Sequence, residues 1–187
     1  KLGISSAYIE QVDNGYYTVD EDGNETFVPG DGKVYGIYVY GGFEENLKLQ
    51  EGNYIITNAN ISYHTGALQV VGVSNIRIEV ESTGNPVTPQ AITSSEWKNI
   101  NDELKYRLVQ FESLKVVGGK DDENTDAYTI YAETPDGVRV NIRIDSNVAL
   151  KVTGIIKNKT WETFKDMTFT NVTGVIQPYY EDYQLMV

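Results

Sequence analysis

The sequence lacks cysteine entirely and contains a single histidine, His64, among its 187 residues. Without cysteine there are no disulfides, no thiolate nucleophile, no cysteine-ligated zinc and no iron–sulfur cluster. One imidazole leaves no second histidine for a multi-histidine metal site, and nothing in the sequence indicates partners that would make His64 a catalytic base. We therefore expect a protein that is not an enzyme and that uses no cofactor, metal or catalytic residue.

Positive charge and long apolar runs are also scarce. Fifteen Lys and Arg residues stand against 27 Asp and Glu, for a net charge of −12, which repels polyanions at long range. No apolar run approaches the roughly 20 residues that span a bilayer. Because the chain begins at Lys1 rather than at methionine, we expect it to be a mature or trimmed fragment.

Short runs rich in Tyr, Val, Ile and Thr fill the sequence, and they alternate with Gly, Asn and Asp. This pattern predicts an all-β chain, with hairpin turns at Asn14-Gly15, Asp22-Gly23 and Asp136-Gly137. The expected strands cover 6–12, 16–20, 33–40, 54–63, 67–80, 108–117, 127–133, 138–145, 168–177 and 183–187.

A polar stretch with two prolines, Pro86 and Pro89, is the best linker candidate. After it, Ser94 or Ser95 can cap a helix that we expect to extend through Tyr106. The predicted organisation is a first domain over 1–83, a linker with a short helix over 84–106, and a second domain over 107–187.

The two halves repeat one another weakly. Residues 57–63, followed by 66–70, resemble residues 170–176, followed by 179–185, because each pair combines a long strand, an aromatic turn and a return strand with Leu and Gln. Such a repeat predicts two copies of one small barrel with about five strands each.

Three segments of the second half, 107–116, 138–144 and 172–176, together with a final Tyr183-Gln184-Leu185, resemble OB-fold modules of secreted and lipid-anchored bacterial proteins of the Bacteroides type. Residues 49–54 carry a looser form of the same pattern, and Asn58-Ala59-Asn60 departs from it. The resemblance implies two tandem five-stranded Greek-key OB-fold barrels joined by a short helix. It also implies an extracytoplasmic lipoprotein, at the cell surface or in the periplasm, that binds single-stranded nucleic acid.

OB folds bind ligands on the outer face of their second and third strands. On the predicted third strand of the second barrel, Arg139, Asn141 and Arg143 alternate with inward apolar residues, and Tyr131 of the strand before it can neighbour the arginines. The following stretch adds Lys157, Lys159 and Trp161, where Trp161 either stacks on a ligand or closes the barrel end. These residues form the predicted binding site, unless the alternation marks only a solvated sheet face.

The first barrel offers aromatic residues without positive charge. On the strand expected at 33–40, either Tyr38 and Tyr40 or the set Tyr35, Ile37 and Val39 faces outward. Exposed tyrosines suit a glycan or a protein partner as well as bases, and this is the alternative function. We expect contact with a membrane only through a lipid anchor outside this segment.

Two acidic turns, 20–25 and 121–126, have the oxygen ligands that hard cations prefer. Neither has the spacing of a known calcium loop, and solvated turns are the simpler interpretation. No metal site is predicted.

Overall fold

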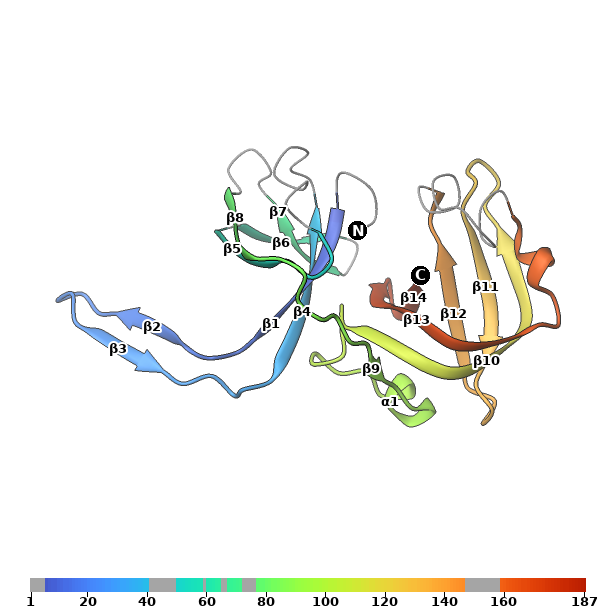
Figure 1. Ribbon diagram of the computed structural model, residues 1–187, viewed down its shortest axis with the longest axis horizontal. Helices are drawn as coiled ribbons and strands as arrows, with labels where there is room; N and C mark the ends of the chain where they lie inside the picture. Colours follow the sequence, from blue (N-terminus) through green and yellow to red (C-terminus); the bar gives the residue numbers. More distant parts are fainter. Residues whose placement is uncertain (1–5, 41–49, 59, 65–66, 72–76, 147–158) are drawn as a thin grey trace.

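A computed structural model describes residues 6–40, 50–58, 60–64, 67–71, 77–146 and 159–187. The chain is almost entirely β, as predicted, and its two β-rich halves lie side by side (Figure 1). The first half contains β1 (Ser6–Val12), β2 (Tyr16–Val19), β3 (Glu25–Val28), β4 (Val34–Tyr40), β5 (Tyr54–Asn58), β6 (Asn60–His64), β7 (Ala67–Val71) and β8 (Arg77–Ser82). The second half and its approach contain β9 (Gln90–Ala91), α1 (Ser94–Lys98), β10 (Leu108–Asp121), β11 (Tyr128–Glu133), β12 (Arg139–Ile144), the 3-10 helix η2 (Trp161–Phe164), β13 (Thr168–Tyr179) and β14 (Asp182–Met186).

The second half is a closed barrel. Its strands follow the order β11-β12-β14-β13-β10, and β10 also pairs with β11, which closes the ring. All neighbours are antiparallel except β12 and β14, which are parallel. Numbered along the chain, the five barrel strands therefore pair in the order 1-2-3-5-4-1, which gives the half an OB-type Greek-key connectivity.

The barrel core follows from strict alternation along its strands. Val140, Ile142 and Ile144 of β12 are almost fully buried, and the residues between them are not. Tyr128, Ile130 and Ala132 of β11 alternate in the same way. The inward and outward residues predicted for these two strands are confirmed.

The first half shares part of this order. Its four-stranded sheet runs β1-β4-β7-β6, with β4 and β7 parallel, which matches β11-β12-β14-β13 of the barrel. Strands β5 and β8 form a separate antiparallel pair, and no pairing closes a ring among the described residues. Among the described residues, the buried cluster of this half consists of Ala7, Val39, Val70 and Ile78.

Several predicted elements need correction. The strand expected at 67–80 is two strands, β7 and β8, which belong to different sheets, and β3 was not predicted. The strand expected at 54–63 is likewise divided into β5 and β6. No helix among the described residues is long and apolar enough to cross a membrane.

The predicted helix is also shorter than expected, because α1 ends at Lys98 instead of Tyr106. Thr93, not Ser94 or Ser95, is its N-cap and forms a capping box with Glu96. The Asn99 side chain bonds back to the Ser95 carbonyl, and Asn101 accepts hydrogen bonds from the amides of the next turn. These asparagines satisfy the backbone locally and so end the helix.

Candidate ligand-binding face

The outward residues of β11 and β12 form one polar surface, which we call the outer face. It consists of Thr129, Tyr131 and Glu133 of β11 and Arg139, Asn141 and Arg143 of β12. The antiparallel register places Tyr131 opposite Asn141, Glu133 opposite Arg139 and Thr129 opposite Arg143. Because directly opposed residues share a face, the predicted neighbourhood of Tyr131 and the arginines is present.

Arg139 and Tyr131 form a stacked pair at the centre of the outer face. The guanidinium carbon of Arg139 lies 4.1 Å from the centroid of the Tyr131 ring, within cation–π range. Its Nε is 3.4 Å from the Asn141 side-chain oxygen. In the described part of the chain, no carboxylate lies within ion-pair distance of Arg139. Its charge is therefore available to a ligand.

Arg143 has a different role. It donates two hydrogen bonds to the Asp122 carboxylate, at 2.9 and 2.6 Å, and a third to the Thr129 hydroxyl. These bonds hold the pKa of Asp122 below its ordinary value and raise the pKa of Arg143. The guanidinium is largely neutralised by the β10–β11 loop, and it braces that loop against the barrel.

The aromatic turn between β13 and β14 is predicted from the sequence, but it is not among the predicted binding residues. Tyr179 and Tyr180 are 53% and 70% exposed, and their rings meet edge to face at 4.8 Å. Tyr180 has a φ of 56°, an unusual conformation for a non-glycine residue. Asp182 of the same hairpin accepts a hydrogen bond from the Asn141 amide, which joins the hairpin to the outer face. The tight aromatic turn was visible in the sequence, but its place beside β12 depends on the parallel pairing of β12 with β14.

The predicted lysines and tryptophan do not extend this surface. Lys157 lies outside the described residues, and Lys159 is exposed ahead of η2. Trp161 packs on Gly119 so closely that a Cβ there would lie 2.4 Å from the indole. Gly119 is opposite Ile130, which faces the barrel interior, whereas Gly118 is opposite Tyr131, which faces outward. Trp161 therefore packs on the inner side of β10. Trp161 thus closes one end of the barrel and is not part of the outer face.

These placements correct the expected basic surface. On the outer face, the β10–β11 loop and the β13–β14 hairpin, two arginines stand against six carboxylates, those of Asp122, Glu123, Asp126, Glu133, Glu181 and Asp182. The local charge is acidic, not basic. A bound ligand must therefore gain more from stacking and hydrogen bonding than from charge.

The predicted tyrosines of the first half, Tyr38 and Tyr40 of β4, lie near the junction of the two halves. Tyr38 is half-buried, and its ring contacts those of Tyr8 and the exposed Tyr40 at a tilt. The Tyr8 hydroxyl donates to Gln177 of β13, and burial raises the pKa of Tyr8. Only Tyr40 of the predicted pair is well exposed, so this strand offers little stacking surface.

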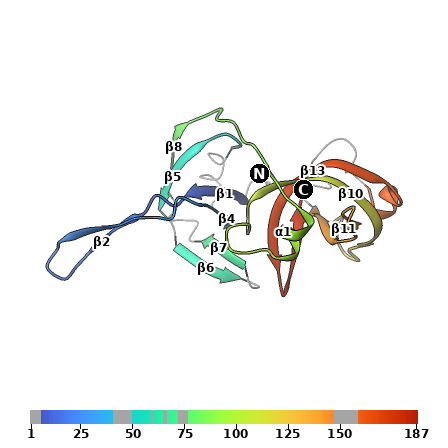
Figure 2. The same cartoon turned by 90° about the horizontal axis from the view of Figure 1, so that it is seen from below.

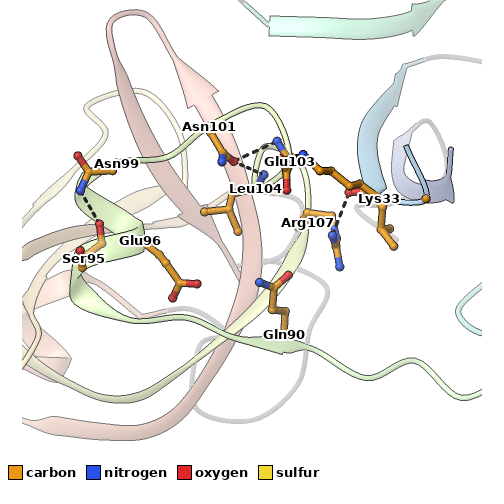
Figure 3. A pocket seen from close by; sticks show the side chains of 11 residues that line it. Lys33, Gln90, Ser95, Glu96, Asn99, Asn101, Glu103, Leu104 and Arg107 are labelled. Atoms are coloured by element: carbon orange, nitrogen blue, oxygen red, sulfur yellow. Dashed lines mark hydrogen bonds and ion pairs between the residues drawn. The ribbon is translucent and has the colours of Figure 1, made fainter. Parts of the chain in front are cut away.

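A polar hollow of about 520 Å³ also lies at this junction (Figure 3). Its charged groups already serve the fold: Lys33 pairs with Glu103, Arg107 donates to the Val34 carbonyl, and Glu96 belongs to the capping box. The hollow lies where the halves meet, and its Lys33, Arg107 and Glu96 side chains already have partners within the chain, whereas the Arg139 guanidinium has no ion-pair partner among the described residues.

In each of the two acidic turns, one carboxylate is hydrogen-bonded within its own chain. Asp20 accepts hydrogen bonds from the Asn24 backbone and side chain, which lower its pKa. Asp122 is held by Arg143. Within the described ranges, no group of three or more His, Asp or Glu side chains is arranged to hold a metal ion.

No protein-family model and no curated protein matches the chain. Among solved structures, a murine DNA binding protein bound with double-stranded DNA is 13% identical, covers 96% of this chain and 93% of its own, and has a TM-score of 0.39. The p204 HINb domain is 11% identical, with 98% and 93% covered and a TM-score of 0.34. The tetrameric p202 HIN2 is 17% identical, with 98% and 90% covered and a TM-score of 0.30. Because these TM-scores are low, the likenesses support no conclusion about the fold or the ligand. The description of the fold rests on the strand order.

Proposed function

We propose that the chain is a non-enzymatic binding module that holds a short stretch of single-stranded nucleic acid on the outer face of its second half. The observation that carries the proposal is the Arg139–Tyr131 pair, in which the guanidinium carbon lies 4.1 Å from the ring centroid and the guanidinium has no ion-pair partner among the described residues. OB folds place their ligands on these two strands and on the loops between strands 1 and 2 and strands 4 and 5. Those loops supply Asp122 and the Tyr179–Tyr180 hairpin here.

Bases, not phosphates, provide most of the binding energy in this proposal. Stacking on an aromatic ring contributes about 1–3 kcal/mol per base. Asn141 can meet base edges because its amide both donates and accepts hydrogen bonds. With Arg143 already paired, the face neutralises only one or two phosphates, so log K should fall with log salt by a slope of about −0.7 to −1.4.

Fluorescence anisotropy with labelled 12-nucleotide DNA and RNA, titrated at several salt concentrations, tests the proposal. Arg139→Ala should weaken binding about tenfold, since it removes both a cation and a stacking plane. Lys98→Ala is the matched control, because it removes an exposed cation that belongs to α1 and not to the outer face. Absence of binding at low salt, or equal losses in the two variants, would refute the proposal.

A second candidate ligand is an uncharged glycan. The exposed tyrosine pair beside the Asp182 carboxylate and the Asn141 amide favours it, because sugars combine apolar ring faces with hydroxyls that donate to carboxylates. OB folds also bind oligosaccharides. Glycan-array binding that is insensitive to salt and lost in Tyr180→Ala would select this ligand over nucleic acid.

The proposal has two further parts. The first rests on the resemblance to surface lipoproteins and the second on the order of the strands. We infer that the chain acts outside the cytoplasm as part of a lipid-anchored protein. We also infer that the first half is a second OB-type module, because its sheet repeats the β11-β12-β14-β13 order in β1-β4-β7-β6. Fractionation of cells that express the full-length protein tests the location.

A further inference from the structure

The β2–β3 hairpin projects away from the body of the molecule (Figures 1 and 2). We call residues 13–31, which include both strands, the arm. Strands β2 and β3 pair only with one another among the described residues, so both outer edges of the ribbon are open. A two-stranded ribbon with no covering layer is at best marginally stable in water. The contacts that hold this ribbon in shape therefore need to be identified.

Hydrogen bonds at the base and the tip shape the arm. At the base, one oxygen of the Asp13 carboxylate accepts from the Gly15 amide and the other accepts from the Asp31 amide, which ties the two chains together. A Cβ on Gly30 would lie 2.2 Å from the Asp13 carbonyl oxygen, so only glycine permits this close approach. At the tip, Asp20 accepts from the amides of Asp22 and Asn24. The arm is a preorganised element and not a loose loop.

The two strands of the arm carry several large apolar side chains that are exposed to solvent. Tyr17 lies opposite Phe27, with ring centroids 5.1 Å apart. Tyr16, Tyr17 and Val19 are 60%, 68% and 64% exposed, and Phe27 is 48% exposed. Exposed apolar side chains gathered on one element mark an interaction surface.

The charge of the arm identifies the kind of partner. Residues 13–31 contain six carboxylates and no Lys or Arg. Only Asp31 lies within ion-pair distance of a described cation, Lys33, at 3.9 Å. A second copy of this chain would place six carboxylates against six, and nucleic acids and anionic membranes are repelled for the same reason.

We propose that the arm docks into a separate protein whose apolar groove is rimmed by Lys and Arg. The Tyr17–Phe27 pair enters the groove, while the acidic tip meets the basic rim. The open edges of β2 and β3 add backbone hydrogen bonds by strand addition. This surface is distinct from the outer face of the second half and does not depend on its ligand.

Three defined ten-residue peptides, titrated into the whole chain and followed through amide NMR shifts, test the proposal. They alternate lysine with valine, glutamate with valine, and lysine with serine. The lysine–valine peptide should shift resonances of β2 and β3 and should bind at least about tenfold more tightly than the other two, because it alone combines charge with apolar contact. Equal binding of all three, or shifts outside the arm only, would overturn the proposal.

Two variants probe the two halves of the surface separately. Tyr17→Ser combined with Phe27→Ser should weaken lysine–valine binding about tenfold, and Glu21→Lys combined with Asp22→Lys should do the same while leaving the aromatic pair intact. Val87→Ser, at an exposed apolar residue outside the arm, is the matched control. Unchanged affinity in both arm variants would refute the proposal. A concentration-dependent dimer that the Tyr17 and Phe27 changes abolish would identify a second copy as the occupant and would also refute it.

Discussion

At the scale of single residues, Arg139 and Arg143 show how equal sequence signals acquire different roles. Both alternate outward on β12, and the period of the strand predicts this. Their roles differ because Asp122 reaches Arg143 from a loop 21 residues earlier in the chain, whereas no described carboxylate reaches Arg139. Strand periodicity contains no information about which loop covers which end of a strand.

Substitution of Arg143 should therefore affect the stability of the fold, whereas substitution of Arg139 should affect ligand binding. Arg143→Ala should lower the free energy of unfolding by about 1 kcal/mol, since it removes a two-bond ion pair that is only 21% and 32% exposed. Arg139→Ala should change stability much less. Urea unfolding of the three proteins measures the difference. Equal destabilisation by the two substitutions would contradict the assigned roles.

The Asp122–Arg143 pair also predicts a pH dependence. The hydrogen bonds from Arg143 lower the pKa of Asp122 below its ordinary 3.8, so the pair stabilises the fold fully above that value. The contribution is lost as the pH falls through the lowered pKa, where the carboxylate takes up a proton. Asp122→Asn should be less stable than the wild type at pH 7, and the gap should close toward pH 2. A gap that persists or widens at acid pH would contradict this account.

At the scale of elements, local patterns were informative and distant contacts were not. Alternation predicted the buried faces of β11 and β12, because period two is a property of the strand itself, and the strands expected at 108–117 and 168–177 correspond to β10 and β13. The division of 67–80 between two sheets depends on strand partners far along the chain. The sequence allows Trp161 either to stack on a ligand or to close the barrel end. Its packing on Gly119 places it at the barrel end.

The contact between Trp161 and Gly119 can be tested directly. Gly119→Ala places a methyl group 2.4 Å from the indole, so the tryptophan must leave its position on β10. Overpacking of this kind costs about 1–3 kcal/mol. Thermal unfolding should show the loss, and the emission of Trp161, recorded in a Trp97→Phe background, should shift to the red. Gly118→Ala, whose added methyl would only touch Tyr131 at 3.5 Å, is the matched control. Similar effects of the two substitutions would refute the packing argument.

At the scale of the whole molecule, polar contacts between distant described residues join the two halves. Arg107 lies 3.0 Å from the Glu10 carboxylate and also donates to the Val34 carbonyl, and Glu10 in turn accepts from the Leu108 amide. None of these pairings has a signature in the sequence, since each joins residues more than 70 positions apart. The segment between the halves contacts both of them, since Asn85 donates to the Gly52 carbonyl and Glu103 pairs with Lys33, but β9 and α1 pack on the second half. β9 pairs with β10, and Trp97 of α1 enters the core of the second half.

The packing of β9 and α1 on the second half predicts where the chain can be cut. A fragment of 88–187 should unfold cooperatively, because it keeps Trp97, which is 7% exposed, donates to the Arg139 carbonyl at 2.9 Å and packs on Phe111. A fragment of 107–187, which follows the predicted domain boundary, loses Trp97 together with buried Ile92 and Leu104. Loss of one buried tryptophan costs about 3–5 kcal/mol, a large part of the 5–15 kcal/mol that stabilises a typical domain. Trp97→Ala in 88–187 should fall between the two in urea unfolding. If 107–187 proved as stable as 88–187, α1 would be a connector between the halves and not a part of the second-half core.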